Sequence, residues 1–140
     1  MNIYSWLPFT EQDLAAAAAV TVKFGAAYNT YSYTESPADY VGTMNGLITP
    51  QLAATLEGVY GTPGVAQVRT SQKQVATGTA VIDSLRAFGP SSITFVVTGT
   101  QHLITVKGST NGSSQYAITV TGSGASWLVN DIQLAAVGQS

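Results

Sequence analysis

Apolar residues change their spacing at about residue 72 of the chain. Before this point they recur every three or four residues, which is typical of helices that pack by one face. After it they alternate with polar residues or form β-branched runs, which is typical of strands. The pattern predicts a single α+β domain over residues 1–140, with about three N-terminal helices followed by an antiparallel sheet of about four strands.

Three helices are expected in the first half. The first spans residues 11–31, with Thr10 as its N-cap and an alanine-rich middle of high helix propensity. The second and third each open with a hydroxyl residue followed by proline, at Ser36-Pro37 and Thr49-Pro50. Proline suits the first helical position because its missing N–H would be unpaired there in any case. Glycines and prolines in residues 61–64 close the third helix.

Four strands are expected in the second half, at residues 74–87, 91–107, 115–121 and 126–136. Turns are expected at Phe88-Gly89-Pro90-Ser91, Asn111-Gly112 and Gly122-Ser123-Gly124, since asparagine and glycine tolerate positive φ. The first two strands are long, and Gly78 and Gly99 are candidate bends within them. A curved sheet with helices laid on its concave face accommodates these elements.

Charge is sparse, because only 9% of residues are charged against about 25% in a typical domain. The net charge is −2 and the five cations are scattered, so direct binding of nucleic acid is not expected. Two of these cations, Arg69 and Lys73, lie in residues 65–73, where the spacing of apolar residues is ambiguous. We expect both side chains to be solvated. The absence of cysteine excludes disulfides and thiolate metal sites.

No apolar run reaches the roughly 20 residues that a membrane span requires, since the longest extends only from Leu14 to Val20. Met1 is followed at once by Asn-Ile-Tyr-Ser-Trp, without the charged region of a signal peptide. We expect the chain to be a soluble fragment of a longer, membrane-anchored protein whose anchor precedes Met1.

Motifs for metal, nucleophile or phosphate chemistry are missing from the sequence. His102 is the single histidine, and no spacing gathers carboxylates around it. No Gly-x-Ser-x-Gly elbow is present, and the glycine-rich segments 108–112 and 122–124 resemble hairpin turns rather than a phosphate-binding loop. We therefore assign no catalytic, cofactor-binding or metal-binding residue and expect no cofactor.

Acid–base chemistry in a cone-shaped domain would need a carboxylate in an apolar cavity and a donor to a developing oxyanion. The available acids are Asp39, Asp83 and Asp131, and the available donors are Tyr28, Tyr31, Tyr40 and Tyr116. Each acid also has a structural interpretation. Asp39 fits the first turn of a helix, Asp83 fits a bulge or rim, and Asp131 lies on a strand whose two faces are not cleanly apolar and polar.

Tyrosines gather in the first half, where Tyr28, Tyr31, Tyr33 and Tyr40 fall within one short segment. A tyrosine suits a position with a buried ring and a solvated hydroxyl, and also suits interfaces. The cluster either closes the corner between the first two helices or forms a binding surface.

The order of motifs resembles the nuclear transport factor 2-like superfamily. The long first helix ends in Phe24-Gly-Ala-Ala-Tyr28-Asn-Thr-Tyr31. The second carries Ser36-Pro37-Ala38-Asp39-Tyr40 and Gly46-Leu47-Ile48-Thr49-Pro50. The last strand carries Trp127-Leu128-Val129-Asn130-Asp131-Ile132.

Within that superfamily the chain is similar, from about residue 10 to 137, to extracytoplasmic domains of conjugation and type IV secretion proteins of Gram-positive, including actinobacterial, membranes. These are the TcpC-type and VirB-type proteins, and the Mce-associated membrane proteins are a sister group. The Asn-Pro-x-Gly turn of VirB-type factors is not found here, where Phe88-Gly89-Pro90 is the nearest element. No interface residue is therefore transferred from them.

This resemblance implies a non-catalytic assembly domain outside the cytoplasmic membrane. Such a domain would contact other proteins of a transfer complex and could form a homo-oligomer. Two alternatives remain open: a small-ligand-binding or acid–base cavity enzyme of the same superfamily, and an Mce-associated transport accessory domain.

Overall fold

The computed structural model describes residues 9–135 and confirms the α+β class. The helices are α1 Glu11–Tyr28, α2 Pro37–Gly42, α3 Pro50–Tyr60 and α4 Pro63–Ser71. The strands are β1 Tyr31–Ser32, β2 Val75–Gly89, β3 Ser92–Thr105, β4 Gly108–Ser123 and β5 Ser126–Leu134. They form one sheet in the order β1-β2-β3-β4-β5, with every neighbouring pair antiparallel. The described sheet thus has five strands where the sequence pattern predicts about four.

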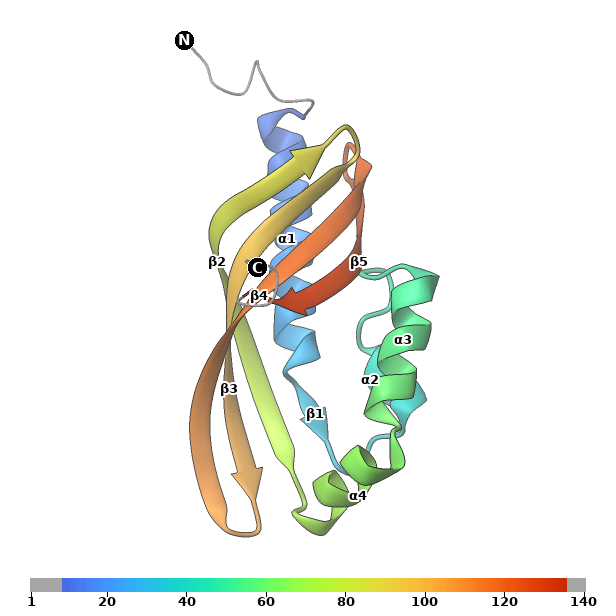
Figure 1. The fold of residues 1–140 in the computed structure, drawn as a ribbon, viewed down its shortest axis with the longest axis vertical. Coiled ribbons are helices and arrows are strands. Elements are labelled where there is room, and N and C mark those ends of the chain that lie inside the picture. The colour runs from blue at the N-terminus through green and yellow to red at the C-terminus, as the bar shows by residue number, and fades with distance from the viewer. Residues whose placement is uncertain (1–8, 136–140) are drawn as a thin grey trace.

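Helix α1 lies across one face of the bent sheet, and α2 and α3 stand together beside β5 (Figure 1). The lower halves of β2, β3 and β4 extend beyond α1 and face the group formed by α2, α3 and α4 (Figure 1).

The predicted helix starts are confirmed. The side-chain oxygens of Thr10, Ser36 and Thr49 each accept a hydrogen bond from the backbone N–H three residues on, and Thr10 forms a full capping box with Asp13. The ambiguous segment 65–73 is mostly helical. Pro63 lies in the first turn of α4, as proline does in α2 and α3, but the N-cap Thr62 makes no side-chain hydrogen bond.

The first helix ends earlier than predicted, at Tyr28 instead of Tyr31. Asn29 is its C-cap, and the Thr30 hydroxyl donates to the Ala26 carbonyl at 2.7 Å. Tyr31 and Ser32 then pair with β2 as a short strand. Backbone pairing with a distant strand therefore replaces the last helical turn, and a local pattern does not reveal such pairing.

The turn predicted at Asn111-Gly112 is wrong. β3 and β4 join through residues 106–107, where Thr105 pairs with Gly108 and Gly108 has a φ of 127°. Asn111 and Gly112 lie inside β4, opposite His102 and Gln101. Gly89 pairs with Ser92, so the first of the other two turns falls within its predicted segment. Ser123 pairs with Ser126, so the last turn overlaps its predicted segment only at Gly124.

No register shift falls at the candidate bends Gly78 and Gly99, because the ladder between β2 and β3 runs unbroken through both residues. The irregularities fall instead between Ile82 and Ser84 and between Leu85 and Ala87. A Cβ added at Gly78 would lie 2.5 Å from the Asn29 Cβ, and one at Gly99 would lie 2.6 Å from the Asn29 Nδ2. The two glycines therefore allow the end of α1 to approach the sheet closely.

The core lies between α1, the concave face of β3–β5, and the pair α2–α3. Its largest fully buried side chains come from all of these layers and include Phe24, Met44, Ile93 and Ile118. The pair α2–α3 also connects to the sheet through backbone bonds. Thr49 donates to the Val129 carbonyl at 3.0 Å, and Val129 donates to the Leu47 carbonyl at 2.8 Å.

Candidate functional site

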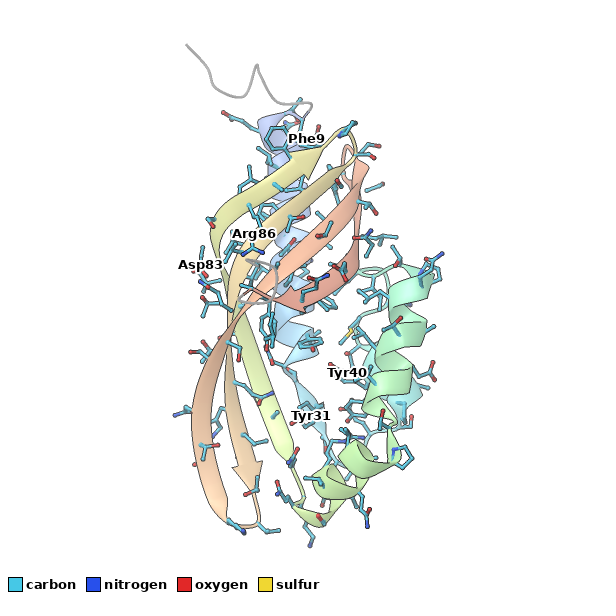
Figure 2. All side chains as sticks on the ribbon, in the orientation of Figure 1. Phe9, Tyr31, Tyr40, Asp83 and Arg86 are labelled. Atoms are coloured by element: carbon cyan, nitrogen blue, oxygen red, sulfur yellow. The ribbon has the colours of Figure 1, made fainter. Side chains whose placement is uncertain are left out.

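A pocket of about 220 Å³ opens between the end of α1, strand β1, helices α2–α4 and the lower part of the sheet. Tyr31 and Tyr40 lie in this region in Figure 2. Its walls are mostly aromatic and apolar, and its single charged lining residue is Arg69. We call it the tyrosine pocket, and its aromatic lining residues are Tyr28, Tyr31, Tyr40 and Tyr60.

The tyrosine rings pack against one another. Tyr40 and Tyr60 stack with ring centroids 4.2 Å apart and planes inclined by 9°. Tyr31 meets Tyr60 edge-on at 6.0 Å. Aromatic pairs of this kind contribute about 0.5–1.5 kcal/mol each beyond the burial of their area. The rings thus hold β1, α2 and α3 in fixed relation.

Three of the four tyrosine hydroxyl groups donate to protein acceptors. Tyr40 donates to the Tyr28 carbonyl at 2.7 Å, which lies at the end of α1. Tyr60 donates to the Ser32 carbonyl and Tyr31 to the Gln74 Oε1, both at 3.1 Å. Closure of the corner between the first two helices, one of the two interpretations of the tyrosine cluster, is therefore confirmed.

The expectation that Arg69 is solvated is wrong. Its side chain is only 5% exposed. The guanidinium carbon lies 3.6 Å from the centre of the Tyr60 ring, and one terminal nitrogen, Nη2, donates to the Tyr60 carbonyl at 3.0 Å. The Tyr60 carbonyl is one of the unpaired acceptors at the end of α3, so a cation is favoured there. Lys73, in contrast, is exposed as expected.

Burial raises the pKa of Tyr28, Tyr31, Tyr40 and Tyr60 above the ordinary value of 10.0. The positive charge of Arg69 partly opposes this increase in the pKa of Tyr31 and Tyr60. A raised folded-state pKa means that the folded protein holds its phenolic protons at a pH where the unfolded chain releases them. The resulting stabilisation is complete below about pH 10 and is lost as the pH rises further.

We expect the free energy of unfolding to fall as the pH rises from 9 to 11, and to fall less steeply in Y40F. At pH 8 the same variant should lose about 1 kcal/mol, because the Tyr28 carbonyl loses its donor. Urea unfolding at each pH measures both effects, and absorbance at 295 nm follows phenolate formation. Parallel pH profiles for wild type and Y40F would contradict the assignment.

The three candidate acids do not meet in the pocket. Asp39 lies in the first turn of α2, as expected. Asp83 lies at the bulge in β2, also as expected, and accepts hydrogen bonds from Thr98 and Gln115. Figure 2 shows Asp83 beside the sheet, well away from Tyr31 and Tyr40.

Asp131 lies on β5, where its carboxylate accepts a hydrogen bond from the Gln133 amide at 3.0 Å. A bulge explains the mixed faces of this strand. Val120 pairs with Val129 and Thr119 with Asp131, so Asn130 has no partner on β4. One extra residue reverses which side chains face the core.

His102 lies exposed on β3 with its Nδ1 2.6 Å from the Asn111 Oδ1, which fits the expected strand position. Among residues 9–135, no group of three or more His, Asp or Glu residues gathers where it could hold a metal ion. No helix within that same range is long and apolar enough to cross a membrane.

The tyrosine pocket also includes residues that the sequence does not indicate as part of a candidate site, namely Tyr60, Arg69, Gln74 and Gln101. They come from α3, α4, β3 and the segment before β2. The one sequence signal for Arg69 is its position directly after Val65-Ala-Gln-Val68, a short segment that contains two valines. A helical period in that segment would predict that Arg69 and Val65 share a face.

Neither a protein-family model nor a curated protein sequence matches the chain. Solved structures do match in fold. The periplasmic domain of DotI aligns with a TM-score of 0.66 at 12% identity, covering 89% of this chain and 96% of that one. An IcmL-like type IV secretion system protein from Legionella pneumophila aligns with a TM-score of 0.59 at 12% identity, covering 85% and 86%.

A third match is CagV, a VirB8 homologue of the type IV secretion system of Helicobacter pylori. It aligns with a TM-score of 0.58 at 16% identity, covering 86% of this chain and 96% of that one. At these identities the comparisons establish the fold, which is the nuclear transport factor 2-like fold of VirB8-like periplasmic domains. The fold predicted from the sequence is thereby confirmed.

Proposed function

We propose that this domain is a non-catalytic, extracytoplasmic assembly domain of a bacterial conjugative-transfer or type IV secretion apparatus that acts through protein–protein contacts. The observation that carries the proposal is the fold shared with DotI, the IcmL-like protein and CagV over most of each chain. Each alignment covers at least 85% of this chain and at least 86% of the matched chain, so the similarity extends over a whole domain rather than a single motif.

The chemistry of the described residues supports the same proposal. Asp39, Asp83 and Asp131 lie on three separate elements, and none lines the tyrosine pocket. An acid–base enzyme needs its carboxylate within reach of bound substrate. The charge-poor surface, in which Ser, Thr, Gln and Asn replace charged residues, suits contacts with other proteins.

The finer proposal is that residues 1–140 form one domain of a longer TcpC-type protein of a Gram-positive envelope, such as an actinobacterial one. In the full-length protein an N-terminal helix would anchor it to the cytoplasmic membrane. Its partners would be other membrane-associated proteins of the same complex, together with further copies of itself. No direct nucleic acid contact is proposed, because the five cations remain scattered over the chain.

Deleting the domain from its full-length gene tests this function. In the deletion strain, transfer of the secreted substrate or of the conjugative element should fall to the level of a strain that lacks the apparatus. Complementation with the wild-type gene should restore it. Unchanged transfer after deletion would contradict the assignment.

A triple conservative variant, D39N/D83N/D131N, separates the scaffold from the acid–base alternative. It removes the candidate carboxylates and keeps the side-chain shapes. If the domain is a scaffold, cells that carry the triple variant should transfer substrate as well as wild-type cells do. Lost transfer, with a native circular dichroism spectrum and unchanged abundance, would favour an enzyme instead.

A further inference from the structure

Arg69 carries a buried charge without a matching anion in the tyrosine pocket. Arginine is seldom fully buried unless it is paired, because removing a charge from water is costly. Yet Arg69 is 5% exposed and no acidic residue lines the pocket. Its position is therefore not explained by an ion pair within the pocket.

The end of α3 accounts for only part of this arginine. A guanidinium has five N–H donors, and within residues 9–135 one nitrogen, Nη2, donates to the Tyr60 carbonyl. The Nε atom is buried and has no hydrogen-bond partner in that range. Nη1 also donates to no residue of that range and, unlike Nε, is not fully enclosed, so it remains available to a ligand.

Most of the other polar groups of the pocket are directed at the protein, although the Tyr28 hydroxyl has no hydrogen-bond partner within residues 9–135. The Tyr31, Tyr40 and Tyr60 hydroxyls donate to the acceptors described above. The Gln101 amide donates to the Asn29 carbonyl at 3.0 Å and the Gln74 amide donates to the Gln72 Oε1 at 2.6 Å. A ligand would therefore meet mainly ring faces, the aliphatic side chains of Leu56, Val59 and Val65, and one cation.

We propose that the tyrosine pocket binds a carboxylate carried on an aromatic or apolar body of about one amino-acid residue. A guanidinium matches the two oxygens of a carboxylate. A phosphate dianion would bring a second negative charge, and no second cation lines the pocket to balance it. The volume of about 220 Å³ equals that of roughly seven liquid waters, which suits one side chain rather than a large cofactor.

Two sources could supply this chemistry: a free small carboxylate, or the C-terminal residue of a partner chain. The inference is independent of the proposed assembly role, because it concerns the lining of one pocket. If transfer survives deletion of the domain while the isolated domain binds the probe, only the proposed function fails. If transfer is lost on deletion while the isolated domain binds no probe, only the pocket proposal fails.

Titration of the domain with phenylacetate, followed by ¹H–¹⁵N correlation spectra and calorimetry, tests the proposal. We expect a dissociation constant on the order of millimolar, with shifted amide signals at the residues lining the pocket. Phenylacetamide has nearly the same shape without the charge and should bind at least about tenfold more weakly, the equivalent of one lost charge-assisted hydrogen bond. Equal binding of the two probes, or shifts elsewhere only, would overturn the proposal.

Two variants of α4 locate the site without removing Arg69. Val65 lines the pocket and is 50% exposed, while Val68 is also 50% exposed on the same helix but does not line it. V65W should fill the pocket and abolish binding, whereas V68W should bind like wild type. Undiminished binding by V65W would overturn the assignment.

R69K, which keeps the charge and loses the planar fork, should weaken binding about tenfold.

Acetylated dipeptides ending in phenylalanine distinguish the two sources. If the peptide with a free C-terminus binds and its amidated form does not, a chain terminus can supply the carboxylate. If only phenylacetate binds, the pocket takes a free small carboxylate. Both outcomes support the proposal, whereas failure of every carboxylate to bind would overturn it.

Discussion

Replacing Trp127 with alanine is expected to lower the free energy of unfolding by about 3–5 kcal/mol, the range for buried large aromatic residues. The Trp127 side chain is 2% exposed on β5 and meets the Phe9 ring edge-on at 5.7 Å. Its indole N–H donates to the Gly124 carbonyl at 2.7 Å. The substitution therefore leaves both a cavity and an unpaired acceptor. Urea unfolding, followed by circular dichroism, measures the difference.

An exposed residue of the same sheet provides the control. Val81 lies on β2 and is 64% exposed, so V81A should change the free energy of unfolding by no more than about 0.5 kcal/mol. A loss below about 1 kcal/mol in W127A would mean that this end of the core collapses around the missing ring, contrary to the packing described here.

Replacing Gly78 with alanine is expected to lower the free energy of unfolding by about 2–3 kcal/mol, as overpacking does in rigid surroundings. The new Cβ would lie 2.5 Å from the Asn29 Cβ and 2.9 Å from the Ala26 carbonyl oxygen. The second contact is with backbone, so relief requires a displacement of the end of α1. That displacement would also move Tyr28, which lines the tyrosine pocket.

Gly112 is the matched control, because a Cβ added there would have no neighbour within 4 Å. G112A should be neutral or stabilise the fold by up to about 1 kcal/mol, since alanine restricts the unfolded chain. Amide chemical shifts at residues 26–31 should change in G78A and not in G112A. Equal stability of the two variants would contradict the close approach of α1 to β2.

The features predicted correctly from the sequence are those that short segments determine. A hydroxyl residue before proline specifies a helix start within four residues, so Ser36-Pro37 and Thr49-Pro50 are reliable signals. The turn at Asn111-Gly112 failed because the long pairing of β3 with β4 extends past a good local turn signal. The end of α1 was misplaced for a related reason, since β1 exists only through its contact with β2.

The residues of the candidate site also divide into those that the sequence reveals and those that it does not. Tyr28, Tyr31 and Tyr40 are close in sequence, and their grouping was visible there. Arg69 and Gln101 reach the same pocket from α4 and β3. Burial of an arginine on a polar-looking segment depends on what packs over it, and the Tyr60 ring that covers Arg69 belongs to the preceding helix.

The parallel bridge between Ile48 and Val129 has a consequence for the order of folding. The segment before α3 rests on β5, so part of the docking surface of the helices does not exist until residues 126–134 have been made. At the usual rate of about 5–20 residues per second, synthesis of the intervening segment takes on the order of seconds, far longer than helix formation. We therefore expect an emerging chain to pass through a stage with formed helices and an open core. Nascent chains stalled before residue 126 should be cleaved by protease within α2 and α3, while completed chains should resist.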